Sequence, residues 1–172
     1  MNPIRAVAAI YRRSGVSHYD GNPFLEALPP IMSLEEASNV LSVYPPIDPE
    51  ELKLPPHIRR HCVGRLFGLV QAAPVYIDLL WSFDELLRGG YTGRNPFSAD
   101  YQRHLYDGSN AEAGGEPPCF SATSGVLMLQ GASGQGKSTL ISRILSRYPQ
   151  VIQHRNYQEK KLWQAQVVWL KI

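Results

Sequence analysis

A glycine-rich run late in the chain has residue types and spacing suited to phosphate chemistry. Residues 131–138, GASGQGKS, fit the phosphate-binding pattern G-x-x-x-x-G-K-[ST]. In this pattern the glycines allow a sharp turn that brings backbone N–H groups against phosphate oxygens. The lysine, here Lys137, brings positive charge to the β- and γ-phosphates, and the Ser138 hydroxyl ligates Mg²⁺. We therefore predict that the loop binds ATP and Mg²⁺. The predicted nucleotide contacts are Gly131, Ala132, Ser133, Gly134, Gln135, Gly136, Lys137, Ser138 and Thr139.

Such a loop needs a strand before it and a helix after it, because the helix N-terminus adds positive potential at the anion. Val126–Gln130 is a nearly all-apolar run, typical of a buried parallel strand. Thr139–Tyr148 has apolar residues at helical spacing and is followed by proline. This context favours a nucleotide site over the alternative, a glycine turn with an ordinary surface lysine. Two further strands are predicted at Val151–Arg155 and Gln166–Ile172.

Length and composition exclude several classes of protein. The chain has 172 residues, of which 44% are hydrophobic; at about 100–200 residues per domain this indicates one domain with or without an extension. No apolar run approaches the ~18–20 residues that span a bilayer, and the arginine-broken start is a poor signal peptide. Two cysteines, Cys62 and Cys119, make no disulfide framework. We expect a soluble, cytoplasmic protein with no membrane partner.

Proline and charge divide the chain. Nine of its 14 prolines lie in residues 1–56, where each fixes φ and removes a backbone donor. Residues 1–56 hold 4 Lys+Arg and 7 Asp+Glu, whereas residues 125–172 hold 7 and 1. The basic end suits phosphate of a nucleotide or of nucleic acid, unless a later segment supplies balancing acids. We predict a mostly helical, proline-rich extension over residues 1–73 and the start of a nucleotide-binding domain over 74–172.

Capping and stop signals place the helices of this extension and of the domain's beginning. A Ser33–Glu36 capping box starts one helix, and Gly89-Gly90 is expected to stop another. The segment Ser109–Pro118 is small, polar and turn-rich, which indicates a loop. The predicted helices are Ile4–Arg13, Ser33 to about Val43, a start at Asp48-Pro49-Glu50-Glu51, His57–Gly68, Pro74–Arg88 with a second capping box at Ser82–Glu85, and a short helix from Ser98 to near Gly108.

Three other segments allow both a functional and a structural interpretation. Arg88–Pro96 is a turn whose arginines and tyrosine suit stacking on adenine or contact with phosphate, or simply a helix end. Asn22–Pro30, bounded by prolines, is a docking peptide if exposed and core packing if buried; we favour docking. His57, His61 and Cys62 form at most half a metal site, so a helix surface is the favoured interpretation.

Several strings resemble one family. Tyr11–Pro30, Leu86–Pro96, the phosphate-binding loop with Ser142–Arg155, and Val167–Ile172 resemble the TnsC/TniB-type AAA+ regulators of DNA transposition, most closely the TnsC members. The resemblance implies an α/β fold with a P-loop NTPase (AAA+) core. It also implies ATP-dependent homo-oligomerisation on double-stranded DNA, and coupling of a target-selecting protein to the transposase. By the family's motif Gly131, Gly136, Lys137 and Ser138 would contact ATP and Mg²⁺.

The ATPase machinery is expected to be incomplete in this chain. A P-loop ATPase needs an acidic residue at the end of another buried strand to orient Mg²⁺ and water. No apolar run ending in Asp-Glu follows Ser138, and Glu159 lies in a polar turn, so no catalytic residue is predicted. We expect the N-terminal part of a longer protein, inactive as an ATPase by itself. The alternative is a catalytically inactive nucleotide-binding or partner-binding module of another P-loop ATPase class.

Overall fold

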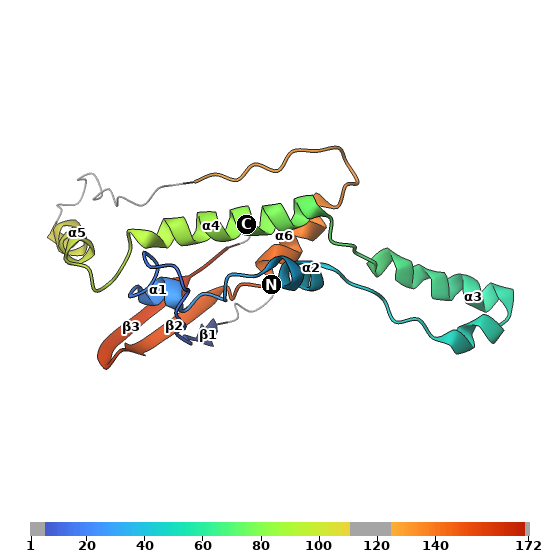
Figure 1. The fold of residues 1–172 in the computed structure, drawn as a ribbon, viewed down its shortest axis with the longest axis horizontal. Helices are drawn as coiled ribbons and strands as arrows, with labels where there is room; N and C mark the ends of the chain where they lie inside the picture. The colour runs from blue at the N-terminus through green and yellow to red at the C-terminus, as the bar shows by residue number, and fades with distance from the viewer. Residues whose placement is uncertain (1–5, 111–124, 171–172) are drawn as a thin grey trace. The chain divides into compact units, whose positions relative to one another are not determined.

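A computed structural model describes residues 6–110 and 125–170, with the side chains of residues 108–110 left undescribed (Figure 1). The chain forms two compact units. The middle unit is Met32–Trp81, and the discontinuous unit combines the residues up to Ile31 with those from Ser82 onward. This division differs from the predicted boundary at residue 73, because the first part of the chain packs with the last. The elements are β1 (Ala6–Ala8), α1 (Pro23–Glu26), α2 (Leu34–Leu41), η1 (Pro49–Lys53), α3 (Pro56–Cys62), η2 (Val63–Gly68), α4 (Pro74–Thr92), α5 (Ala99–Asn110), α6 (Lys137–Leu145), β2 (Val151–Tyr157) and β3 (Lys160–Val167).

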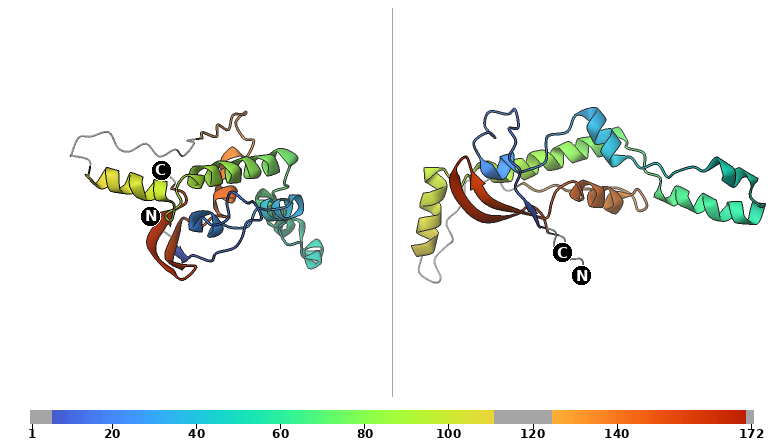
Figure 2. Two further views of the ribbon diagram at one scale, coloured as in Figure 1. Left: turned by 60° about the vertical axis from the view of Figure 1, so that its left-hand side comes forward. Right: turned by 90° about the horizontal axis from the view of Figure 1, so that it is seen from below.

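The discontinuous unit is built on a three-stranded sheet in the order β1-β2-β3. β1 pairs in parallel with β2, where Ala6 lies opposite Val151. β2 and β3 form an antiparallel hairpin, drawn as a curved ribbon in Figure 2. Its two-residue turn places Gln158 and Glu159 at φ +46° and +66°, the positive values that a tight hairpin turn requires. The prediction that Glu159 lies in a turn is therefore confirmed.

The core of this unit includes the segment predicted to be a docking peptide. Phe24, Leu25 and Leu28 are all buried. The Phe24 ring contacts the His154 ring edge-on, with 5.2 Å between the ring centroids. The backbone carbonyl of Phe24 accepts a 3.1 Å hydrogen bond from Gln166 Nε2. The docking interpretation of residues 22–30 is wrong, because the large apolar side chains that a docking peptide would present, Phe24, Leu25 and Leu28, are buried.

The middle unit carries a helical arm, residues 44–69. The two ends of the arm are held together at its base, where Val43 and Val70 exchange backbone hydrogen bonds of 2.8 and 2.9 Å. Its outward run ends in η1, and the chain returns through α3 and η2 (Figure 1). The helix predicted at residues 57–68 is thus present as a short α-helix followed by a 3-10 helix, since no i→i−4 ladder continues past Val63.

Local capping signals correctly predicted where several helices begin. Ser33 accepts from Glu36 N, and the Glu36 side chain accepts from Ser33 N, so the predicted capping box is confirmed. Asp48 caps Glu50 N at the start of η1. Ser98 accepts from Tyr101 N at 3.2 Å and begins α5, which runs two residues beyond the predicted end.

Four predictions of secondary-structure elements were wrong, because contacts with residues distant in the sequence determine these elements. Ala6–Ala8, predicted helical, is the edge strand that pairs with β2. α4 continues through Gly89-Gly90 to Thr92, so neither the predicted stop nor a capping box at Ser82–Glu85 is present. The last strand is Lys160–Val167, shifted from the predicted residues 166–172, because β3 follows the register of its hairpin with β2.

The fourth error concerns Val126–Gln130, which the structure shows outside the sheet and not as a strand. Val126 is 91% exposed. An extended segment without a paired neighbour gains no ladder hydrogen bonds. Cys119 and nearly all of the predicted loop 109–118 lie outside the described residues. No helix in residues 6–110 or 125–170 is long and apolar enough to cross a membrane.

Candidate nucleotide-binding site

The glycine-rich loop leads directly into α6. Gly134 and Gly136 have φ of +82° and +75°, a region that side-chain-bearing residues rarely adopt. Gly136 is the N-cap of α6, and no side chain caps the helix there. The positive end of a nine-residue helix is therefore presented at the loop without a protein carboxylate or hydroxyl on it. This is the local arrangement that binds phosphate elsewhere.

Lys137, the first residue of α6, folds back over the loop. Its Nζ donates hydrogen bonds to the carbonyl oxygens of Gly131 at 2.8 Å and Ala132 at 2.5 Å. The ammonium thus closes the loop on itself. A charged phosphate oxygen is a stronger acceptor than a carbonyl, so an incoming phosphate can take the place of these two partners without moving the helix.

The structure brings together all nine predicted contacts, since they are consecutive, and leaves most of them exposed. Residues 131–136, Ser138 and Thr139 are exposed, whereas Lys137 is half-buried. The site is an open loop on a helix and not a closed cleft. Leu140 and Ile144 are buried and anchor α6 in the discontinuous unit. The exposed loop is therefore attached to a helix that is held in place by packing.

Among the described residues no group of three or more His, Cys, Asp or Glu side chains is arranged to hold a metal ion. Ser138 is the hydroxyl that would meet Mg²⁺ if the nucleotide brings the ion with it. His57 and His61 are exposed on α3, which is where the helix-surface interpretation places them.

Arg88 and Tyr91, considered as adenine contacts, serve the core instead. Arg88 is buried; its Nε donates to Asp84 Oδ2 at 2.7 Å, and its guanidinium donates to the Pro29 carbonyl at 2.5 Å. The Tyr91 hydroxyl donates to the Val167 carbonyl at 2.7 Å. Burial raises the pKa of the Tyr91 phenol. Arg88 is therefore held in the core, away from any base, and the Tyr91 hydroxyl is bonded to β3.

A buried polar network behind α6 was not anticipated from the sequence. The Tyr148 hydroxyl donates to Asp84 Oδ1 at 2.9 Å, and the Tyr148 carbonyl accepts from Trp169 Nε1 at 2.9 Å. Burial, and then the Asp84 carboxylate, raise the pKa of Tyr148. The i, i+4 spacing of Asp84 and Arg88 was the one visible signal, since it places an ion pair on one helix face.

No protein-family model matches the chain, and no curated protein matches it. The site is therefore defined by its own chemistry: a loop with two left-handed glycines, an uncapped helix N-terminus and a lysine that reaches the loop's first carbonyls.

Proposed function

We propose that the chain is an ATP-binding regulator of DNA transposition, acting through residues 131–139. The observation that carries the nucleotide part is the uncapped N-terminus of α6 behind Gly134 and Gly136, with Lys137 bent over the loop. Backbone N–H groups of the loop would hold the β- and γ-phosphates, Lys137 would neutralise them, and Ser138 would complete the coordination of Mg²⁺.

The transposition part of the proposal is supported by the sequence resemblance. It implies an AAA+ core, homo-oligomerisation on double-stranded DNA, and contact with a target-selecting protein and a transposase in the cytoplasm. The basic C-terminal part, with 7 Lys+Arg against 1 Asp+Glu in residues 125–172, agrees with partners that carry phosphate.

A second candidate is a nucleotide-binding module without turnover. It is favoured by residues 126–130, which form no strand in the described sheet and so do not place the loop at the end of a strand. Both candidates bind ATP, and they differ in hydrolysis. We expect no phosphate release from this chain alone; steady release that Lys137→Ala abolishes would show that an acid such as Glu159 serves instead.

Titration with a fluorescent ATP analogue and Mg²⁺ tests the shared claim. Lys137→Ala should weaken binding at least tenfold, about 1.4 kcal/mol, because it removes the ammonium that meets the phosphates. Arg147→Ala is the matched control: it removes one exposed cation just beyond α6 and should leave affinity unchanged. Equal affinity of Lys137→Ala and the unaltered chain would refute the proposal.

A further inference from the structure

The arm, residues 44–69, encloses an apolar groove of about 650 Å³. Residues 44–48 and η1 form one wall, and α3 with η2 forms the other. The groove lies within the middle unit. Its apolar lining includes Tyr44, Ile47, Leu52, Val63, Leu66 and Leu69.

Large apolar side chains of the arm remain in water. Ile47 is 86% exposed, Leu52 75% and Phe67 97%. Several such residues on one short segment form a contiguous apolar surface, and surfaces of this kind mark interaction sites. Isolated exposed apolar residues would need no explanation, but Ile47 and Leu52 both line one groove, whereas Phe67 lies outside its lining.

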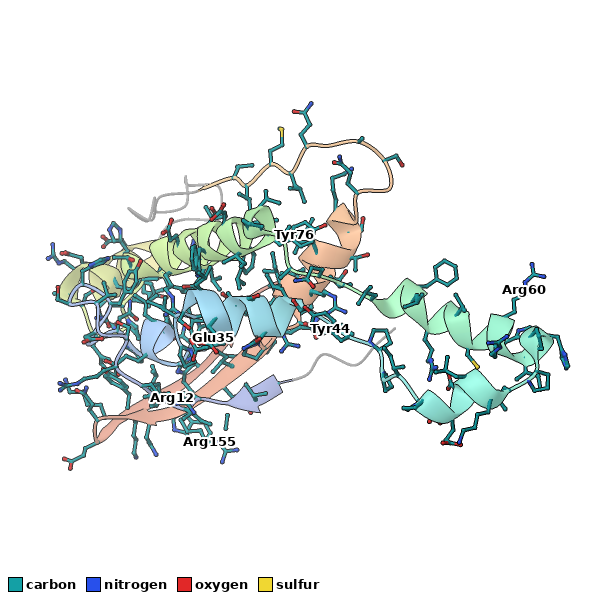
Figure 3. All side chains as sticks on the ribbon, turned by 45° about the vertical axis from the view of Figure 1, so that its right-hand side comes forward. Arg12, Glu35, Tyr44, Arg60, Tyr76 and Arg155 are labelled. Atoms are coloured by element: carbon teal, nitrogen blue, oxygen red, sulfur yellow. The ribbon has the colours of Figure 1, made fainter. Side chains whose placement is uncertain are left out.

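Three arginines and two carboxylates line the groove: Arg59, Arg60 and Arg65, with Asp48 and Glu51. On the outward wall Lys53 pairs with Glu50 at 2.7 Å, and Glu51 pairs with Arg65 of the opposite wall. Arg59 and Arg60 also line the groove, and neither takes part in an ion pair among the described residues. Figure 3 shows the Arg60 side chain extended outward from α3. The Asp48 carboxylate accepts from Glu50 N at 3.0 Å. With Glu51 paired to Arg65, Arg59 and Arg60 outnumber Asp48, so the apolar groove keeps a net positive charge.

The backbone of the groove is fixed before any partner arrives. Pro45, Pro46 and Pro49 stiffen the outward wall, and Pro55 and Pro56 start the return helix. The Val43–Val70 pairing closes the base. A surface that is already ordered loses little entropy on binding.

We propose that this groove binds an acidic amphipathic helix of a partner protein. The apolar face of such a helix fills the groove, as amphipathic helices do in other grooves, and its carboxylates pair with Arg59 and Arg60. A second copy of the arm is a poor occupant, because it brings its own Arg59 and Arg60 to the same place. The inference goes beyond nucleotide binding and does not require the loop at residues 131–138.

A pair of synthetic peptides tests this. One has leucines at helical spacing flanked by glutamates, and the other has lysines in place of the glutamates. Measured by fluorescence anisotropy on the full chain, the glutamate peptide should bind at least ~tenfold more tightly. Arg59→Glu with Arg60→Glu should reverse the preference, and Leu66→Glu should weaken both peptides.

Cys62 gives a second readout, since its side chain also lines the groove. Burial, and then Glu51, raise the pKa of the thiol, so alkylation is followed at mildly alkaline pH in a Cys119→Ser background. The glutamate peptide should slow alkylation, and replacing residues 44–69 by a short glycine linker should abolish peptide binding.

Three results would overturn the proposal: equal binding of both peptides, unchanged alkylation with peptide bound, or arm-dependent self-association in sedimentation. Lys137→Ala should leave peptide binding unchanged. Failure of the groove and failure of the nucleotide site are therefore distinguishable.

Discussion

Tyr148 donates a 2.9 Å hydrogen bond from its buried hydroxyl to Oδ1 of Asp84 in α4. Tyr148 lies just beyond α6, so this bond ties the helix behind the glycine-rich loop to the core. The other carboxylate oxygen of Asp84 accepts from Arg88. The position of the exposed loop thus depends on a buried carboxylate that lies far from it in sequence.

Removing the Tyr148 hydroxyl should destabilise the fold. In Tyr148→Phe the Asp84 oxygen loses a donor while remaining buried, which costs about 1–3 kcal/mol. Thermal unfolding should show a lower melting temperature for Tyr148→Phe. Tyr106→Phe, at an exposed tyrosine, should change the melting temperature very little. An unchanged melting temperature in Tyr148→Phe would mean that the bond is not made in solution.

Glycine substitutions should separate loop strain from helix propensity. Gly136→Ala forces a side chain into φ +75°, which costs roughly 1–2 kcal/mol, so it should weaken binding of the ATP analogue. Gly89→Ala lies inside α4, where an added Cβ meets nothing within 4 Å, and should stabilise by about 0.5–1 kcal/mol. Calorimetry with nucleotide titration measures both; similar effects of the two changes would contradict the loop conformation.

Leucine truncation should distinguish core from surface in the N-terminal part. Leu25 is 1% exposed, whereas Leu52 is 75% exposed. Leu25→Ala should cost about 2–5 kcal/mol through lost burial and a cavity; Leu52→Ala should change stability little. Urea unfolding compares the two, and equal midpoints would restore residues 22–30 as a surface peptide.

His154 should make the fold sensitive to acid. Its Nδ1 lies 3.0 Å from the Tyr11 hydroxyl and its Nε2 lies 3.0 Å from Gln166 Oε1, and burial lowers its pKa below the ordinary 6.5. The unfolded chain therefore binds this proton more readily than the folded one. The contribution of neutral His154 to the free energy of unfolding is complete above about pH 6.5. This contribution falls as the pH drops toward the lowered pKa.

Unfolding free energy measured from pH 7.5 down to 5 checks this prediction. The unaltered chain should lose stability below pH 6.5, and His154→Gln should remove part of that slope. His57→Gln, on the exposed surface of α3, is the control and should keep it. A flat profile in the unaltered chain would contradict the burial of His154.

The sequence predicted features whose causes are local. The Ser33–Glu36 capping box needs only residues three apart, and the phosphate-loop pattern is a run of neighbours. Their hydrogen bonds and φ values follow from nearby residue types, so both could be located without any knowledge of the fold.

Other features depend on contacts that no local pattern contains. Val126–Gln130 is as apolar as a buried strand but has no strand beside it. α4 passes two glycines, and beyond them the Tyr91 carbonyl accepts from Asn22 Nδ2 at 2.9 Å. The partner of Asp84 across the core, Tyr148, could not be read from an i, i+4 spacing.

The pairing of β1 with β2 also sets an order of events during synthesis. Ala6 lies opposite Val151, and Ala9 N donates to the Gln153 carbonyl at 2.9 Å. A ribosome adds roughly 5–20 residues per second, so β1 has no strand to pair with until Val151 and the residues after it have been synthesised. Contacts so distant in sequence form slowly. The discontinuous unit therefore completes its sheet only after the β2–β3 hairpin has emerged from the ribosome, and the early residues depend on the late ones for their structure.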